Sequence, residues 1–177
     1  MSVKVAKGYS LWLQPEGPLF TRLSGLIEAL AQQFGTPAFE PHVTLLSGVT
    51  GSKDDVLRRA EGLCRRLVPF IVPARCLDSR PEYFRCFFVR LEETPVLLNA
   101  HARAVECFAQ EPAEFLPHLS LVYGDLSRQE KVELASQLGR DWHFDLRIQQ
   151  VHVYRTEGAP HEWYRVRQFP LVPGAAP

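Results

Sequence analysis

Two short stretches of this sequence repeat one pattern. Residues 39–46 read Phe-Glu-Pro-His-Val-Thr-Leu-Leu, and residues 115–122 read Phe-Leu-Pro-His-Leu-Ser-Leu-Val. Each has a phenylalanine, then proline and histidine, and then a hydroxyl residue two positions after the histidine. The histidines, His42 and His118, are 76 positions apart (118 − 42) in a chain of 177 residues. The two halves of the chain therefore contain an internal repeat, centred on a histidine and a hydroxyl residue.

Both stretches are predicted to be strands, because apolar and β-branched residues flank and fill them. Successive side chains in a strand point to opposite faces, so residues two apart share a face. His42 therefore shares a face with Thr44, and His118 shares one with Ser120. The apolar residues between and after them face the other way, toward a core. The proline before each histidine suits a strand start, where its missing N–H costs no ladder hydrogen bond.

Composition limits the classes of protein that this chain can represent. Hydrophobic residues make up 46%, enough for a sizeable core. Lys plus Arg and Asp plus Glu balance at 20 each, which argues against tight, sequence-blind binding of long nucleic acid through many phosphate contacts. Small phosphate-bearing substrates remain open. The four cysteines form neither a C-x-x-C pair nor a zinc pattern with the histidines, so we expect reduced thiols and no cofactor.

The organisation expected from the sequence is a single two-lobed domain. No signal peptide is evident at the N-terminus, and no apolar run reaches the ~18 residues of a membrane-spanning helix. We expect one domain over residues 1–170, a disordered tail over residues 171–177, and a cytoplasmic monomer that does not contact a membrane. Long nucleic acid is not an expected partner.

Periodicity and turn residues predict an α+β protein of the order β-α-β-α-β-β-α-β-α-β-β-β. Each of the two packed lobes contributes one motif strand. Strands are expected over residues 9–14, 42–48, 70–78, 84–91, 118–124, 142–149, 151–156 and 163–169. Helices are expected over residues 19–34, 52–67, 94–109 and 127–138, where Ser52, Thr94 and Ser127 are the predicted N-caps.

If a pseudo-two-fold relates the lobes, the two histidine and hydroxyl pairs face each other across a cleft. Imidazole titrates near neutrality, so one can act as a base while the other acts as an acid. Hydrolysis of a phosphodiester needs that pairing. Thr44 and Ser120 can hydrogen-bond the phosphate oxygens, where charge accumulates. The motif carries no metal-ligand set, so a metal-independent mechanism follows most simply. We expect His118 to activate water and His42 to protonate the leaving oxygen.

With its paired histidine and hydroxyl strands, the sequence resembles the 2H phosphoesterase superfamily, in particular the plant and yeast type of cyclic phosphodiesterase. The residues that carry the resemblance are Tyr9-Ser-Leu-Trp12, Pro41-His-Val-Thr44 and Pro117-His-Leu-Ser-Leu-Val-Tyr123, and the likeness covers residues 9–169. The resemblance implies a bilobal fold in which two antiparallel sheets face a central cleft, with helices outside. It also implies hydrolysis of small-molecule substrates, either nucleoside 2′,3′-cyclic phosphates or ADP-ribose 1″,2″-cyclic phosphate.

The resemblance carries four site residues onto His42, Thr44, His118 and Ser120, and places Tyr123 in the site. Simple strand alternation, in contrast, turns Tyr123 away from the face that His118 occupies. On a neighbouring strand, Trp12 and Ser10 share a face. They are candidates for contacting the ribose or base, Trp12 by stacking. For His101, in a predicted helix, we expect a solvated face.

Two other functions remain open. One is an RNA-end processing enzyme of the same superfamily, which acts on a 2′,3′-cyclic phosphate or a 2′-5′ linkage. The balanced charge of the chain disfavours it. The other is a nucleotide-binding module without catalysis, which the intact histidines and hydroxyls disfavour.

Overall fold

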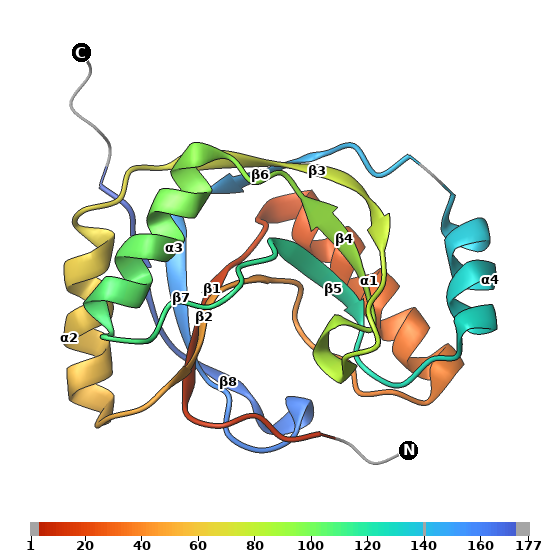
Figure 1. Cartoon of the computed structure of the whole chain (residues 1–177), viewed down its shortest axis with the longest axis horizontal. Helices are drawn as coiled ribbons and strands as arrows, with labels where there is room; N and C mark the ends of the chain where they lie inside the picture. Colours follow the sequence, from red (N-terminus) through yellow and green to blue (C-terminus); the bar gives the residue numbers. More distant parts are fainter. Residues whose placement is uncertain (1–3, 140, 173–177) are drawn as a thin grey trace.

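The strands of this protein join edge to edge in one curled antiparallel sheet (Figure 1). The computed structural model describes residues 4–139 and 141–172. Within them, eight strands lie in the order β6-β3-β4-β5-β2-β1-β7-β8. Their bounds are β1 (Tyr9–Leu13), β2 (Val43–Val49), β3 (Phe70–Asp78), β4 (Phe87–Leu91), β5 (His118–Val122), β6 (Asp145–Ile148), β7 (Gln150–Arg155) and β8 (Tyr164–Pro170).

Four α-helices and two short 3-10 helices connect these strands in the described part of the chain. They are α1 (Gly17–Phe34), α2 (Lys53–Cys64), α3 (Pro95–Cys107), α4 (Arg128–Leu138), η1 (Tyr83–Arg85) and η2 (Pro160–Glu162). The predicted order of strands and α-helices is confirmed, and with it the α+β class. None of the helices in residues 4–139 and 141–172 combines the length and the apolar character needed to cross a membrane.

The sheet has two halves that meet at the motif strands. One half is β6-β3-β4-β5, and the other is β2-β1-β7-β8. The strands β2 and β5 pair antiparallel through Val43 and Leu119, the residues that directly follow the two motif histidines. The two predicted sheets are thus present as halves of one sheet, each of which contributes a motif strand. This narrow junction brings the two motifs side by side.

The sequence repeat is also a structural repeat. The segments β1-α1-β2-α2 and β4-α3-β5-α4 have the same order of elements. In the sheet ladders, Trp12 lies opposite Thr44, and Phe88 lies opposite Ser120. Phe88 lies 76 positions after Trp12, and Ser120 lies 76 positions after Thr44, which is also the spacing between the two motif histidines (88 − 12 and 120 − 44). Each repeat also reaches into the other half, since α1 contacts β5 and α3 contacts β2.

Helix ends follow the predicted capping residues. The side chains of Ser52 and Thr94 accept hydrogen bonds from the first turns of α2 and α3. Ser127 and Glu130 form a reciprocal capping box at the start of α4. Gly35 ends α1 in the left-handed conformation, with φ of 63°, which glycine adopts without steric cost.

Strand alternation places the core as predicted. Val43, Leu45, Leu119 and Leu121 are all at most 1% exposed. They lie in the hydrophobic core, on the face of β2 and β5 opposite the histidine and hydroxyl face. On β1, Leu11 and Leu13 belong to the same core. The other face of β1 is therefore left for Ser10 and Trp12, and Gln14 directly follows the strand.

Some predicted boundaries are wrong. The sequence predicts that residues 84–86 begin a strand, but residues 83–85 form η1 and the strand β4 begins at Phe87. The fold also extends past residue 170, because Leu171 is buried and its N–H donates to the carbonyl oxygen of Gln149. The first two residues of the expected tail are therefore ordered, whereas residues 173–177 lie outside the described residues.

Candidate active site

One cavity of about 490 Å³ lies where the two motifs meet. Six of the seven predicted site residues line it, namely Ser10, Trp12, His42, Thr44, His118 and Tyr123. The seventh, Ser120, is buried outside this lining. Its hydroxyl donates a hydrogen bond to the carbonyl oxygen of Phe84 at 3.0 Å. The two hydroxyls of the repeat are therefore not equivalent, since Thr44 borders the cavity and Ser120 holds η1 against β5.

The two motif histidines are oriented in the same way. Nδ1 of His42 lies 2.6 Å from the carbonyl oxygen of Glu40, and Nδ1 of His118 lies 2.7 Å from that of Leu116. A carbonyl oxygen only accepts hydrogen bonds, so each Nδ1 carries the proton. Each neutral ring therefore has its lone pair on Nε2. The same hydrogen bond forms in both motifs, because in each the accepting carbonyl belongs to the residue before the proline of the Pro-His pair.

The surroundings of the two imidazoles differ. His42 is 4% exposed and stacks on Trp12, with ring centroids 3.5 Å apart. Burial lowers the pKa of His42 to about 3, and the positive charge of a protonated His118 acts in the same direction. His118 is half-buried and meets Phe88 edge-on at 5.0 Å. Burial also lowers the pKa of His118, with a further decrease from Arg85.

Tyr123 faces the cavity, so the expectation from simple alternation is wrong. The strand β5 ends at Val122, and alternation does not extend to the next residue. The ring of Tyr123 stacks on Phe39 at 3.7 Å, and its hydroxyl lies 3.2 Å from Nε2 of His42. Burial raises the pKa of Tyr123. The hydroxyl therefore stays protonated and donates a hydrogen bond to the lone pair on Nε2 of His42.

Trp12 lines the cavity but offers no free ring face for stacking. One face is covered by His42, and Tyr154 stacks on the other with ring centroids 3.7 Å apart. No ring face of Trp12 is therefore open for a base to stack on. Ser10 also lines the cavity, and its hydroxyl shares a hydrogen bond of 2.9 Å with that of Thr156.

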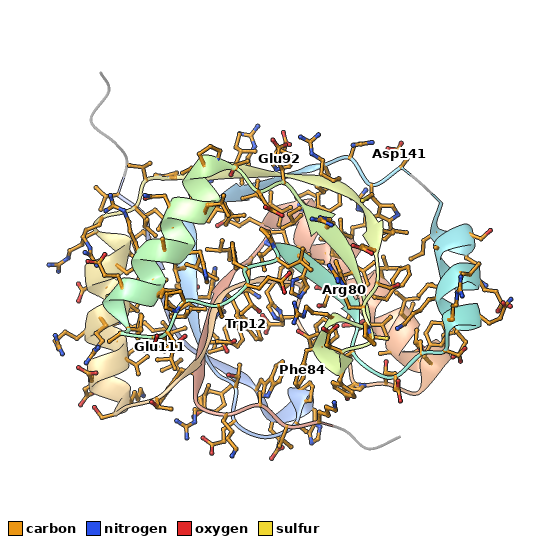
Figure 2. All side chains as sticks on the ribbon, viewed as in Figure 1. Trp12, Arg80, Phe84, Glu92, Glu111 and Asp141 are labelled. Carbon is orange, nitrogen blue, oxygen red and sulfur yellow. The ribbon has the colours of Figure 1, made fainter. Side chains whose placement is uncertain are left out.

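Two other aromatic rings are better placed to contact a base. Phe84 and Trp163 are half-buried, line the cavity and have ring centroids 6.0 Å apart. Figure 2 shows Phe84 in η1 on one side of Trp12 and Glu111 on the opposite side. Trp163 was missed at the sequence level, because it follows η2 near the C-terminus, far from either motif. Only the path of the chain brings it to the cavity.

His101 does not lie on a solvated face as expected. It is half-buried, and its Nδ1 lies 2.8 Å from the carbonyl oxygen of Leu45. Its ring stacks on Phe115 at 3.9 Å, and it lines the cavity. The helix α3 crosses to the strand β2 of the other half, a packing that the helical stripe alone does not reveal.

Charged side chains of both signs line the cavity. Lys7 and Arg85 are cationic, and Glu111 and Glu114 are anionic. Among residues 4–139 and 141–172, no group of three or more His, Cys, Asp or Glu side chains is arranged to hold a metal ion. The titratable groups that line this cavity include the imidazoles of His42, His118 and His101, the hydroxyl of Tyr123 and the carboxylates of Glu111 and Glu114.

Known proteins share this sequence and this fold. A family model described as cyclic phosphodiesterase-like protein matches residues 7–171. A cyclic phosphodiesterase of Arabidopsis thaliana is 30% identical over 124 residues, which is 70% of this chain and 68% of the plant protein. A 2′,3′-cyclic-nucleotide 3′-phosphodiesterase of Yarrowia lipolytica is 30% identical over 142 residues, which is 75% of this chain and 64% of the yeast protein.

Solved structures agree in fold at low sequence identity. The protein TT0787 of Thermus thermophilus has a TM-score of 0.67 at 16% identity, and the match covers 95% of this chain and 100% of that one. E. coli LigT complexed with 3′-AMP has a TM-score of 0.59 at 14% identity, covering 94% and 99% of the two chains.

The family match, the paired motif and the shared fold together identify a 2H phosphoesterase. Within that class, the chain belongs to the cyclic phosphodiesterase-like protein family. Membership of this family makes it a phosphodiesterase.

Proposed function

We propose that this protein hydrolyses ribose cyclic phosphates to phosphomonoesters by metal-independent catalysis with His42 and His118. The substrate is a nucleoside 2′,3′-cyclic phosphate or ADP-ribose 1″,2″-cyclic phosphate. The observation that carries the proposal is the pair of imidazoles at one cavity, each with its Nδ1 proton held by a backbone carbonyl. The relatives named as cyclic phosphodiesterases, and the LigT complex with 3′-AMP, support a nucleotide substrate.

The reaction needs one proton acceptor and one proton donor. A water oxygen forms a bond to phosphorus as the bond from phosphorus to one ribose oxygen breaks. One imidazole takes a proton from the water, and the other gives its proton to the departing ribose oxygen. Thr44 donates its hydroxyl to a non-bridging phosphate oxygen, where negative charge accumulates. The hydroxyl of Tyr123 does the same once it leaves Nε2 of His42.

The two environments support a division of roles opposite to the one expected from the sequence. His42 is deeply buried, accepts a hydrogen bond on Nε2 and has a pKa of about 3. What supports the role of base is that this neutral imidazole carries a lone pair on Nε2 at the cavity, which can accept a proton from water once the hydroxyl of Tyr123 moves to the phosphate. His118 is half-buried, so its protonated form is less costly. The phosphate anion of the substrate further favours protonation of His118, which suits the acid.

The test is turnover of a 2′,3′-cyclic nucleotide in excess EDTA. We expect the wild-type protein to be active and His42→Ala and His118→Ala each to lose about 10²- to 10⁴-fold in kcat, the usual contribution of one general acid or base. Glu28→Gln, on the exposed face of α1, is the control and keeps wild-type activity. Unchanged turnover in either histidine variant, or loss of activity with EDTA alone, contradicts the mechanism.

A further inference from the structure

Glu40 contacts His42 through its backbone and two other residues through its side chain. Its carbonyl oxygen accepts the Nδ1 proton of His42 at 2.6 Å. Its carboxylate oxygen Oε2 accepts a hydrogen bond from Nε2 of Gln14 at 3.0 Å and another from the hydroxyl of Tyr154. The carboxylate is thus bonded to the residue that directly follows β1 and to a residue of β7. Through its own side chain, the residue whose carbonyl orients His42 is fixed at both places.

The ring of Tyr154 closes a loop of contacts around His42. It stacks on Trp12 with an interplanar angle of 21°, and the opposite face of Trp12 stacks on His42 at 5°. Contacts therefore run from His42 to Glu40, to Tyr154, to Trp12 and back to His42. The hydrogen bond at Nδ1 limits rotation of the imidazole in its plane, and the stack limits its tilt.

Tyr154 serves as a hydrogen-bond donor in this loop. Burial raises its pKa, and the bond to Glu40 acts in the same direction. Its hydroxyl therefore stays protonated at neutral pH and donates to the carboxylate. A hydrogen bond to a charged acceptor is stronger than one between neutral groups.

The second histidine is held by different contacts. In the repeat, Leu116 corresponds to Glu40 and Phe88 corresponds to Trp12, each at the spacing of 76 (116 − 40 and 88 − 12). Leu116 provides a backbone carbonyl but an apolar side chain. Phe88 meets His118 at an interplanar angle of 60° rather than flat. The carboxylate, the tyrosine and the flat stack are specific to His42.

We propose that Glu40 and Tyr154 are positioning residues, which hold the imidazole of His42 with its Nε2 directed into the cavity. This proposal rests on the proposed function, in which His42 moves a proton. Neither residue contacts the reacting atoms. Their effect on the reaction acts through the orientation of His42, and we expect it in kcat rather than in KM.

Two variants separate positioning from folding. Tyr154→Phe keeps the ring that stacks on Trp12 and removes the hydroxyl. Glu40→Ala removes the carboxylate and keeps the carbonyl, at an exposed residue whose side chain the core does not need. The matched controls are Tyr164→Phe, at a tyrosine that is 59% exposed on β8, and Glu28→Gln on α1.

In turnover of a 2′,3′-cyclic nucleotide, we expect each variant to lose about 10-fold or more in kcat, since a displacement of about 1 Å in a reacting group can cost about 10²-fold. KM should stay within about two-fold, because substrate contacts are unchanged. The double variant should fall no further than the less active single variant, since both act through one network. Both controls should match the wild-type protein.

The second readout is the imidazole ¹⁵N spectrum of the free protein at neutral pH. We expect His42 to show one tautomer, protonated on Nδ1, in the wild-type protein and a mixture in Glu40→Ala and Tyr154→Phe. An unchanged kcat in both variants overturns the proposal, and so does a fall in kcat with an unchanged His42 spectrum. If the wild-type protein shows no turnover, the proposed function fails, and the spectrum alone decides whether these residues hold the ring.

Discussion

At the scale of single residues, the surroundings of an imidazole decide its charge. His42 and His118 come from the same motif and have the same hydrogen bond at Nδ1. His42 is buried under Trp12 and Tyr123, whereas His118 retains contact with solvent. Because desolvation disfavours the charged ring, His42 is kept neutral over a wide pH range. Because the folded state keeps His42 neutral, the free energy of unfolding depends on pH.

His42 should make the protein less stable in mild acid. In the unfolded chain its pKa is near 6.5, and in the folded protein it is about 3. Between these values the unfolded chain binds more protons, so the free energy of unfolding falls as the pH falls from 6.5 toward 3. At pH 5 the loss due to His42 is about 2 kcal/mol.

Urea unfolding at pH 7.5 and pH 5.0, for the wild-type protein and His42→Gln, measures this effect. Gln does not titrate, so the variant should lose about 2 kcal/mol less between the two pH values. His118 and His152, whose pKa values are also lowered, remain in both proteins and cancel in the difference. Equal losses in the two proteins would show that His42 does not carry this linkage.

At the scale of elements, the cavity wall depends on a close approach between β1 and β2. Gly8 directly precedes β1 and has a φ of 76°. An added Cβ there would overlap the carbonyl oxygen of Val49, at the end of β2. The carbonyl oxygen of Gly8 also accepts a hydrogen bond of 3.0 Å from the backbone N–H of Thr156, beyond β7. Glycine at this position lets three segments that border the cavity come together.

Gly8→Ala should therefore destabilise the protein by about 1 to 3 kcal/mol or more, from backbone strain and overlap. The matched control is Gly25→Ala, since Gly25 lies in the exposed face of α1 and an added Cβ there has no atoms within 4 Å. That change should stabilise by about 0.5 to 1 kcal/mol, because alanine favours helix. Denaturant unfolding compares the two. Similar effects of both substitutions would contradict the close approach at Gly8.

At the scale of the whole molecule, charge is balanced overall but unevenly placed around the cavity. The chain has a formal net charge of zero. Glu111 and Glu114 line the cavity on the loop after α3, and Lys7 and Arg85 line it on other segments. A long polyanion gains few phosphate contacts from a neutral surface.

We therefore expect a cyclic mononucleotide to be turned over at least as efficiently as an oligonucleotide that ends in a 2′,3′-cyclic phosphate. The measurement is kcat/KM for both substrates at about 50 mM and 200 mM salt, a range over which binding through many phosphates weakens strongly. We expect little change with salt for either substrate. A strong preference for the oligomer that fades with salt would instead favour RNA-end processing.

The fold could be predicted from the sequence wherever local rules decide. Strand period placed Val43 and Leu45 in the core, and capping residues marked the helix starts at Ser52 and Ser127. The boundaries that failed are those where tertiary contacts compete with local preference. Residues 83–85 form η1 rather than the start of a strand, and Leu171 is packed into the core rather than left in a tail.

The sequence by itself determined that His42 shares a strand face with Thr44 and that His118 shares one with Ser120, because side chains alternate with a period of two along a strand. The pairing of β2 with β5 in the folded sheet is what brings the two motifs to one cavity. Only the tertiary structure decided what surrounds them. Tyr123 turns in where β5 ends, Trp12 is covered by Tyr154 from β7, and His101 arrives on α3 from the other repeat. These contacts join residues far apart in the chain. They depend on strand order and helix packing, and the local periodicity of the sequence predicts neither.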